Sequence, residues 1–391
     1  MLDCIIVGGG IQGITLATFL LKSGKVTVDQ LAIVDMNEEP LARWRQCTEV
    51  ISMPYLRSPS VHHLDVKPFS LQTYVKKSGD DWNTAFYGRY KRPSLAAFME
   101  HCEHLCDELS IKRAWVQGKV RAASKRENGW AVHLSNGEQL YGRKLFLAIG
   151  IGEQPYWPEW AVRLKQNQES TIFHIFDDQL PAFDQVKRPI TIIGGGISSV
   201  HLALKLGERF PNEVTLLKRH PFRIFDFDSD PAWLGPKNQY SFRNLKSYQK
   251  RREQIIEARH KGSIPPDLHM KLLNRIKQGS LRLVDGEVES TEVQNGNIML
   301  HDKNGKIIEQ TGTILLATGF LSSLPGEEWL SPVIDMYQLR CADCGYPIVS
   351  QSLQWGPDLY VTGALAELEI GPIARNISGA RHAAERIVAS L

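Results

Sequence analysis

The stretch Asp3-Cys4-Ile5-Ile6-Val7-Gly8-Gly9-Gly10-Ile11-Gln12-Gly13 decides the fold of this chain. Its apolar residues 5–7 predict a short buried parallel strand. A G-x-G-x-x-G turn follows at Gly8, Gly10 and Gly13 and leads into a helix-forming run. The first glycine permits the tight turn, the second lets the backbone approach a pyrophosphate, and the third lets the helix pack closely on the strand. The N–H groups at the helix start suit phosphates, so the stretch indicates a dinucleotide site, although such turns also serve packing alone.

An acidic residue follows the next predicted strand. Residues 30–34 predict a second buried strand, and Asp35 stands at its end, about twenty residues beyond Gly13. A dinucleotide-binding unit places an acid there to accept hydrogen bonds from ribose hydroxyls. The alternative is a solvated turn acid, because Asn37-Glu38-Glu39-Pro40 comes next. The spacing favours the ribose contact.

A second copy of the opening motif lies in the middle of the chain. Residues 190–193 are apolar and lead into Gly194-Gly195-Gly196-Ile197-Ser198-Ser199, where Ser199 replaces the third glycine with another small residue. The next predicted strand, 213–217, ends in Lys218 and Arg219 instead of an acid. An arginine at this place suits a 2′-phosphate, which it can bind bidentately. An exposed basic pair is the alternative.

The repetition extends beyond the two glycine turns. Residues 298–320 mirror residues 132–150, and both segments carry a hairpin turn, at Asn136-Gly137 and at Asn304-Gly305. Two copies of one nucleotide-binding module are therefore predicted. Residues 222–278 form an insertion in the second copy, with an aromatic and acidic beginning and a helical stretch around 246–261.

Residues 41–90 lack clean periodicity and are rich in Trp, Tyr, Arg, Ser and Pro. A long loop beside a cofactor fold is more often functional than not, and residues 53–60 look structured because two prolines hold them. Helical spacing resumes over 93–109. Cys102 and Cys106 fall on the apolar stripe of that helix, which is a more economical explanation than half of a metal site.

Composition bounds the class of protein. The chain has 391 residues, enough for two or three domains, and its 46 Lys and Arg against 43 Asp and Glu give a net charge of only +3. This balance does not favour nucleic acid or an anionic membrane as partners. No apolar run is long enough for a membrane span, no signal peptide is evident, and six cysteines form no disulfide framework. We expect a cytoplasmic protein; a homo-oligomer is compatible with the sequence.

The end of the chain is predicted to return to the first domain. Residues 359–363 predict a strand, and Gly371-Pro372 predicts the start of a helix that continues through Ile387. A helix N-terminus here could face a flavin pyrimidine edge and stabilise negative charge on the reduced ring.

These features together resemble the flavoproteins with two dinucleotide-binding domains, and within them the single-component flavin monooxygenases of the lysine/ornithine N-hydroxylase type. The resemblance covers essentially the whole chain. It rests on the first glycine turn with Asp35 for FAD, the second with Arg219 for NADPH, and Ala317-Thr318-Gly319-Phe320.

The resemblance implies a reaction cycle. NADPH reduces FAD, the reduced flavin reacts with O2 to give a C4a-hydroperoxide, and a nucleophilic substrate takes the distal oxygen, with N-hydroxylation of an amine as the expected outcome. The protein contributes positioning, charge placement and exclusion of solvent. No protein nucleophile or metal is required, so catalytic residues stay unassigned and no metal site is predicted.

Three departures from the family pattern bear on this reading. Ile172-Phe173-His174 keeps a histidine without the surrounding motif, so His174 is either an NADP⁺ contact or a packed interdomain residue. Ala148-Ile149-Gly150 stands where Ala-Thr-Gly is expected. Gly363-Ala364 stands where disulfide reductases have Gly-Asp, which favours a monooxygenase.

Two alternatives stay open. Cys341 and Cys344 have C-x-x-C spacing, so an NAD(P)H-dependent disulfide or quinone-type reductase is one, although the pair follows the second module, unlike either usual reductase arrangement. A non-catalytic FAD-binding redox module is the other. Substrate is expected between the domains, walled by residues 53–60, 89–92 and 226–233, where the acids could hold an ammonium or cap helices.

The fold expected is α/β, with two Rossmann-like doubly wound domains. Residues 1–160 form the first part of the FAD domain, 185–330 the inserted NADPH domain, and 331–391 the C-terminal part of the FAD domain. The predicted cofactor contacts are Gly8, Gly10, Gly13, Asp35, Trp44, Gly150, Gly194, Gly196, Ser199, Lys218, Arg219, Thr318, Gly319, Gly363, Gly371 and Pro372.

Overall fold

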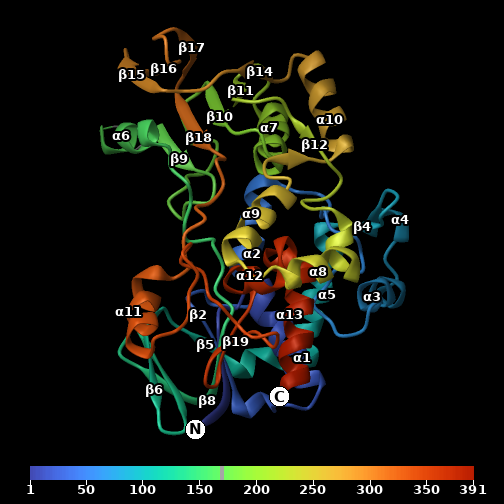
Figure 1. Ribbon diagram of the computed structural model, residues 1–391. Helices are drawn as coiled ribbons and strands as arrows, with labels where there is room; N and C mark the ends of the chain where they lie inside the picture. Colours follow the sequence, from blue (N-terminus) through green and yellow to red (C-terminus); the bar gives the residue numbers. More distant parts are fainter. Residues whose placement is uncertain (168–170) are drawn as a thin grey trace.

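Two separate sheets with parallel central strands organise the protein, one toward each end of the molecule (Figure 1). The computed structural model describes residues 1–167 and 171–391. Each sheet is covered by helices, and an apolar core lies beneath each cover. The predicted α/β class with two Rossmann-like units is confirmed.

The first sheet has eight strands, in the order β19-β20-β8-β1-β2-β5, with β7 on β8 and β6 on β7. The central strand β1 is parallel to both β2 and β8, and its residues Ile5 and Ile6 are fully buried. Burial on both faces explains the continuous apolar run. The strands are β1 Leu2–Val7, β2 Leu31–Asp35, β5 Trp115–Gln117, β6 Val120–Arg126, β7 Gly129–Leu134, β8 Gln139–Leu147, β19 Gln354–Gly356 and β20 Leu359–Val361.

Helices from both ends of the chain cover the first sheet. Helix α1 (Ile11–Lys22) packs along α13 (Ile377–Ser390), and the two lie side by side near the termini (Figure 1). Helix α5 (Leu95–Glu108) follows the predicted spacing and buries Cys102 and Cys106 in its stripe, as expected.

Residues 41–90 are more ordered than their irregular pattern predicted. They contain α2 (Ala42–Ile51), α3 (Ser70–Ser78) and α4 (Trp82–Ala85). The two longer helices bury only two residues each, so their sequences contain no apolar stripe that would predict a helix. Short strands β3 (Phe86–Tyr87) and β4 (Arg92–Pro93) close the segment.

The second sheet has five strands in the order β14-β11-β10-β18-β9, all parallel. The strands are β9 Ile172–His174, β10 Ile190–Ile193, β11 Val214–Lys218, β14 Arg282–Asp285 and β18 Thr313–Leu316. Helix α7 (Ile197–Arg209) follows β10, as α1 follows β1. Between β14 and β18 an antiparallel ribbon is made by β15 (Ser290–Gln294), β16 (Asn297–His301) and β17 (Ile307–Thr311), with the predicted turn at Asn304-Gly305.

The predicted insertion, residues 222–278, lies between β11 and β14. It contains β12 (Arg223–Ile224), a 3₁₀ turn at Pro231–Leu234, α8 (Pro236–Asn244), α9 (Tyr248–Ala258) and β13 (Ser263–Ile264). Helix α10 (Pro266–Lys277), which lies within the predicted 222–278, packs on α7 and leads into β14, which is parallel to β11. It is the crossover helix that such a parallel pair needs. The domain bounds themselves stay a prediction.

The C-terminal segment also differs from expectation. The predicted strand is confirmed as β20, parallel to β8. Gly371-Pro372, however, opens only a 3₁₀ turn, Pro372–Arg375, and α13 begins at Ile377. Asn376 caps α13, because its side chain accepts a hydrogen bond from Gly379 N at 2.9 Å. A 3₁₀ turn at Gly363–Ala366 and α12 (Glu367–Ile370) precede this turn.

Two further helices, α6 (Glu159–Asn167) and α11 (Glu327–Tyr337), lie at the edges of the sheets. Within the part of the chain that the structure describes, no helix combines the length and the apolar character needed to cross a membrane.

Candidate functional site

Steric demands explain the glycines of the first turn. Gly8 has φ +107°, and a Cβ there would stand 2.6 Å from the carbonyl oxygen of Ala148. A Cβ on Gly13 would overlap the carbonyl oxygen of Gly8. Gly10 has no atom near its Cβ position, so the space above the start of α1 is open. The turn thus combines two glycines that the backbone requires with one that leaves room for a ligand.

Asp35 points at this turn from the end of β2. Its Oδ2 accepts a hydrogen bond from Gly9 N at 2.6 Å, and its Oδ1 accepts one from Asn37 N at 2.9 Å. The ring of Trp115, from β5, lies against Gly9. The carboxylate is therefore fixed beside the turn and is half-buried, which is the placement that a ribose contact requires.

Three buried polar atoms around the first turn have no hydrogen-bond partner in the described chain. They are Gln12 Oε1, Trp44 Nε1 and Thr362 Oγ1. Gln12 lies within the turn, Trp44 lies on α2, and Thr362 follows β20. The start of α2 is tied to the turn, since Leu41 N donates to Gly9 O at 3.0 Å. Buried polar groups normally find partners, so these three atoms and the open Gly10 fit a bound polar cofactor.

The C-terminal segment covers the same turn. Gly363, with φ +61°, lies so close to Gln12 that a Cβ would stand 3.0 Å from Gln12 Cγ. Gln12 Nε2 donates to the carbonyl oxygens of Ala374 at 3.1 Å and Asn376 at 3.3 Å. Gly371, with φ +90°, packs instead against Trp233 of the insertion. Residues 359–374 are all buried, so this cover is part of the core.

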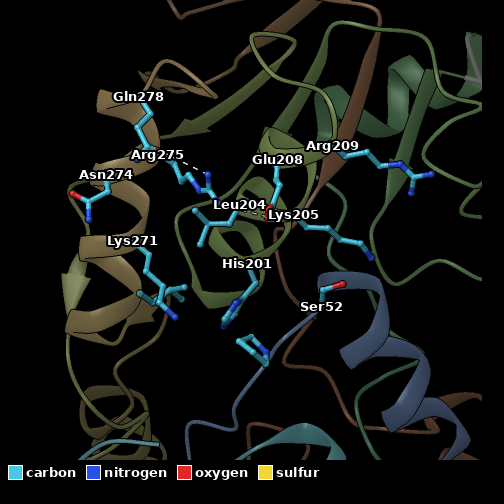
Figure 2. Close-up of a pocket in the computed structure, with 12 residues that line it drawn as sticks. Ser52, His201, Leu204, Lys205, Glu208, Arg209, Lys271, Asn274, Arg275 and Gln278 are labelled. Carbon is cyan, nitrogen blue, oxygen red and sulfur yellow. Dashed lines mark hydrogen bonds and ion pairs between the residues drawn. The ribbon is translucent and has the colours of Figure 1, made fainter. Parts of the chain in front are cut away.

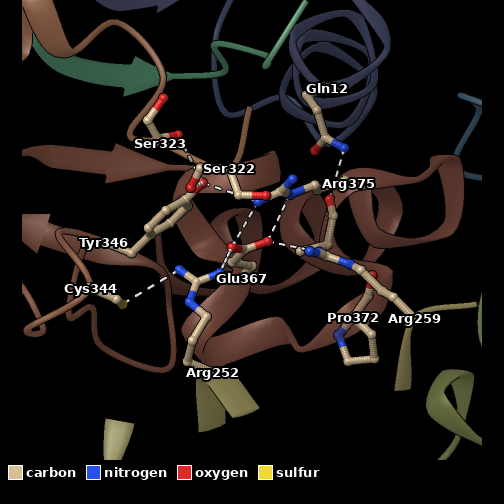
Figure 3. Close-up of polar contacts among 11 residues, drawn as sticks. Gln12, Arg252, Arg259, Ser322, Ser323, Cys344, Tyr346, Glu367, Pro372 and Arg375 are labelled. Atoms are coloured by element: carbon tan, nitrogen blue, oxygen red, sulfur yellow. Dashed lines mark hydrogen bonds and ion pairs between the residues drawn. The ribbon is translucent and has the colours of Figure 1, made fainter. Parts of the chain in front are cut away.

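A buried carboxylate holds the cover to the insertion (Figure 3). Glu367 is fully buried and pairs with three arginines: Arg252 on α9, Arg259 just after it, and Arg375, with Arg259 and Arg375 each at 2.7 Å. Burial by itself raises the pKa of Glu367, yet the three guanidinium groups together lower it to about 2. The arrangement joins α9 to α12 across more than a hundred residues of sequence.

The second turn repeats the steric logic of the first. Gly194 has φ +154°, and a Cβ there would stand 2.6 Å from the carbonyl oxygen of Ala317. Ser199 fills the third position, and its Oγ donates to Gly196 O at 2.8 Å. A Cβ on Gly196 would meet only Gly262 of the insertion, at 3.4 Å.

Lys218 and Arg219 occupy different environments at the end of β11. Lys218 is buried and already paired with Asp285. Arg219 keeps 67% of its side chain exposed and lies 3.2 Å from Glu287. Arg219 is thus the better placed of the two to meet a phosphate in the groove, and its contact stays a prediction.

His174 is a packed residue between the two units. It is fully buried on β9, its Nε2 lies 3.1 Å from Gly319 O, and its Nδ1 accepts from Phe176 N at 3.3 Å. Burial lowers the pKa of His174 to about 4, so its ring is neutral near pH 7. Of the two open readings, the structure favours the packed interdomain histidine.

The segment after β18 connects the two units. Thr318 Oγ1 donates to Tyr156 O, and Tyr156 N donates to Gly319 O at 2.9 Å. A Cβ on Gly150, which follows β8, would have only Gly152 N within 4 Å, at 3.9 Å. The structure places Thr318 and Gly319 at the connection between sheets and Gly150 at the first sheet.

Arg57 links the predicted substrate walls. Its guanidinium donates to the carbonyl oxygens of residues 225–227 at 2.7 to 2.9 Å and to Ser263 Oγ at 2.9 Å. Burial lowers the pKa of Arg57 to about 10, partly opposed by Asp228 and Asp226. Asp230 caps the following 3₁₀ turn, whereas Asp226 and Asp228 are exposed. Residues 53–60 and 226–233 are therefore neighbours, as predicted.

Arg92, from the third predicted wall, pairs with Asp267 at the start of α10 at 2.7 Å. It therefore contacts the second module.

Cys341 and Cys344 lie on a hairpin after α11. All six cysteines fall in the described part of the chain and are free thiols. Cys344 is exposed, and Arg252 Nη2 lies 3.6 Å from its Sγ, whereas burial raises the pKa of Cys341. Among residues 1–167 and 171–391, no group of three His, Cys, Asp or Glu could hold a metal ion.

Three residues of the site were missed from the sequence. Gln12 lies inside the glycine motif, and nothing in the nearby sequence indicates that its side chain contacts the C-terminal segment. Glu367 is surrounded by apolar residues, and Arg57 is one of many arginines. Buried carboxylates are rare unless paired, so Glu367 was the most recoverable of the three.

Comparisons with known proteins agree with this geometry. The family model described as FAD-NAD(P)-binding matches residues 5–152. Among solved structures, the ornithine hydroxylase PvdA from Pseudomonas aeruginosa superposes with a TM-score of 0.78 at 18% identity, over 99% of this chain and 98% of that chain.

Two further structures have the same fold. The cadaverine monooxygenase DfoA of desferrioxamine biosynthesis from Erwinia amylovora, solved with FAD, gives 0.77 at 16% identity, over 99% and 93% of the chains. L-lysine 6-monooxygenase from Pseudomonas syringae gives 0.72 at 19% identity, over 100% and 99%. No curated protein sequence matches. The predicted resemblance is thereby confirmed in fold.

Proposed function

We propose that this protein is a FAD-dependent, NADPH-using monooxygenase that hydroxylates the nitrogen of a small amine. The observation that carries the proposal is the match of nearly the whole chain to solved N-hydroxylating monooxygenases, with both glycine turns built. At such low sequence identity the solved structures support only the fold, and the reaction depends on the residues that this chain places at the site.

The first turn is the proposed FAD site. Gly10 leaves room for the pyrophosphate at the start of α1, and Asp35 faces the ribose position. Gln12, Trp44 and Thr362 hold the unpartnered polar atoms that a flavin nucleotide would satisfy. Bound there, FAD would accept a hydride from NADPH, react with O2 and supply the oxygen atom.

The second turn is the proposed NADPH site. Gly196 lies open apart from Gly262, and Arg219 can reach a 2′-phosphate from the end of β11. Since Lys218 is already paired with Asp285, Arg219 carries the selectivity in this proposal.

The amine would be recognised near the segment that Arg57 holds. Asp226 and Asp228 are exposed carboxylates there, while Phe225 stacks on His260 and Phe227 contacts Tyr90. Carboxylates and aromatic faces both suit an ammonium. The partners proposed are therefore a small amine and O2; we expect a cytoplasmic enzyme.

A dithiol reductase is less well supported. Cys344 contacts Arg252, and Tyr346 of the same hairpin donates to the carbonyl oxygens of Ser322 and Ser323, both at 3.0 Å. These contacts give the hairpin a structural role. Ala374, whose carbonyl oxygen accepts a hydrogen bond from Gln12 Nε2, is followed by Arg375, which donates to Tyr346 Oη.

Product analysis tests the proposal. The FAD-loaded protein is supplied with NADPH, O2 and, in turn, ornithine, lysine, cadaverine and related amines, while NADPH loss, hydrogen peroxide and hydroxylamine are measured. We expect one class of amine to yield hydroxylamine in near-equal amount to the NADPH consumed. Asp228→Asn should raise the KM for the amine, whereas Asp343→Asn should not. Peroxide without hydroxylamine for every amine, or disulfide reduction lost in Cys344→Ser, would contradict the proposal.

A further inference from the structure

A large cavity outside both glycine turns has no role in the proposed reaction. It measures about 840 Å³ and lies between α7, α10 and the end of α2. It begins one turn beyond the second glycine turn, at His201, and runs along α7 to Arg209. A ligand in it would touch both modules, since Ser52 and Pro54 belong to the first and the helices to the second.

The lining of this cavity is strongly cationic. It contains Lys205, Arg209, Lys271 and Arg275 against a single carboxylate, Glu208. That surplus of three positive charges equals the net charge of the entire chain. Charge of one sign gathered in a concave site raises the local concentration of ions of the other sign.

Two of the four cations have no carboxylate partner in the part of the chain that the structure describes. Arg209 pairs with Asp184, and Arg275 lies 3.6 Å from Glu208. Lys205 Nζ donates to main-chain carbonyls at the end of α2, those of Glu49 at 3.0 Å and Val50 at 2.9 Å, and lies over the ring of Phe183. Lys271 has no ion pair with any residue that the structure describes, and its nearest aromatic partner is Tyr87.

Neutral polar groups accompany these two lysines. Lys271 extends from α10 and His201 from α7 toward the space between the helices, and Ser52 borders it from α2 (Figure 2). The His201 ring has no hydrogen-bond partner within 1–167 or 171–391, and burial together with Lys271 lowers its pKa to about 4. A neutral imidazole beside a lysine can donate a hydrogen bond to an oxyanion without titrating near pH 7.

We propose that this cavity binds a small molecule with two or more negative charges, either phosphates or carboxylates. Lys271 and Lys205 neutralise the charges from the two helices, and His201 donates a hydrogen bond. Because Lys205 also holds the end of α2, the ligand bridges the two modules at a place distinct from the dinucleotide grooves.

Calorimetric titration of the FAD-loaded, full-length protein tests this site. Tripolyphosphate and citrate are the probes, at matched ionic strength and with saturating NADP⁺, so that the second glycine turn is occupied. We expect saturable binding of one anion per chain. Lys271→Glu should weaken it about tenfold or more, and the matched Lys277→Glu, on α10 outside the cavity, less than about twofold.

The outcomes are distinct from those of the proposed reaction, because no turnover is measured. Binding of tripolyphosphate alone identifies a phosphorylated ligand, and binding of citrate alone a polycarboxylate; both support the site. Absence of saturable binding, or equal weakening by Lys271→Glu and Lys277→Glu, overturns it. Circular dichroism of both variants verifies that they fold, and if Lys271→Glu does not, Lys271→Gln takes its place with an expected loss of about fivefold.

Discussion

The two glycine turns of this protein share one backbone and differ in everything placed around it. In each, a Cβ on the first glycine would stand 2.6 Å from a carbonyl oxygen, of Ala148 or of Ala317. At the first turn, a carboxylate, Asp35, bonds to Gly9 N, and a fully buried C-terminal segment lies over Gln12. At the second, the strand ends in Lys218 and Arg219, and only Gly262 approaches Gly196.

This difference separates the backbone geometry, which the two turns share, from the surroundings of each turn, which differ. Steric exclusion fixes the backbone of the turn. We expect the charge at the neighbouring strand end to select the ligand. We propose that the turn with an acid, where the C-terminal segment packs on Gln12, holds the cofactor that stays, and that the turn with a base holds the one that is exchanged each cycle. The following changes test that division, beginning with the largest expected effect.

The third position of the motif should show the sharpest contrast. Gly13→Ala places a Cβ against the main-chain oxygen of Gly8, which cannot move without distorting β1, so we expect a loss of about 3 kcal/mol or more in stability and loss of FAD. Ser199→Ala removes one hydrogen bond to Gly196 and should cost about 1 kcal/mol. Urea unfolding and flavin content measure both; equal losses would show that the turns are not differently constrained.

The cover of the first turn should depend on Glu367. Glu367→Gln removes the buried counter-charge of three partly buried arginines, and we expect a loss of about 3–5 kcal/mol in unfolding free energy. Glu287→Gln, beside the second turn and 68% exposed, should change it by no more than about 1 kcal/mol.

The stability of the protein at low pH should also depend on Glu367. The pKa of Glu367 lies at about 2 in the folded protein and at 4.5 ordinarily. Its contribution is therefore complete above pH 4.5 and is lost as the pH falls toward 2. In Glu367→Gln this acid limb of the stability curve should flatten; an unchanged limb would assign it to other groups.

Cofactor selectivity tests the second turn. Arg219→Ala should raise the KM for NADPH by about 10- to 100-fold, the value of a lost charged hydrogen bond, with little change for NADH. Arg282→Ala, on β14 and 61% exposed, is the matched control and should leave both values alone. Equal effects on the KM values for NADPH and NADH would mean that Arg219 does not bind the 2′-phosphate.

Buried histidines give the first module a milder sensitivity to acid. Burial lowers the pKa of His63 to about 4 and that of His101 to about 3, from 6.5. Their neutral forms are therefore favoured in the folded state, and stability is complete above pH 6.5 and declines as the pH falls toward 4. Thermal unfolding between pH 7 and 6 should show a decline of about 1–2 kcal/mol that His101→Gln reduces. A flat profile would mean that these rings are already solvated.

The sequence was most informative where local sterics act. The glycines at 8, 13 and 194 are dictated by neighbouring carbonyls, so the turns, their strands and their helices followed from a few residues. Asp35 was recoverable because its spacing from Gly13 is set by one helix and one strand.

The remainder depended on contacts distant in sequence. Pro372 predicted a helix start, yet Asn376 provides the cap that α13 uses. Helices α2 and α3 bury too few side chains to produce a stripe. Glu367 meets Arg252 and Arg259 only after the insertion folds onto the C-terminal segment, a pairing that no local pattern encodes.

A crystal structure of the protein with FAD and NADP⁺ tests the division of the two turns most directly. We predict flavin nucleotide density with its pyrophosphate over Gly10 and a ribose on Asp35, and NADP⁺ density with its pyrophosphate over Gly196 and its 2′-phosphate on Arg219. FAD at the second turn, or NADP⁺ with its 2′-phosphate remote from Arg219, would contradict the account.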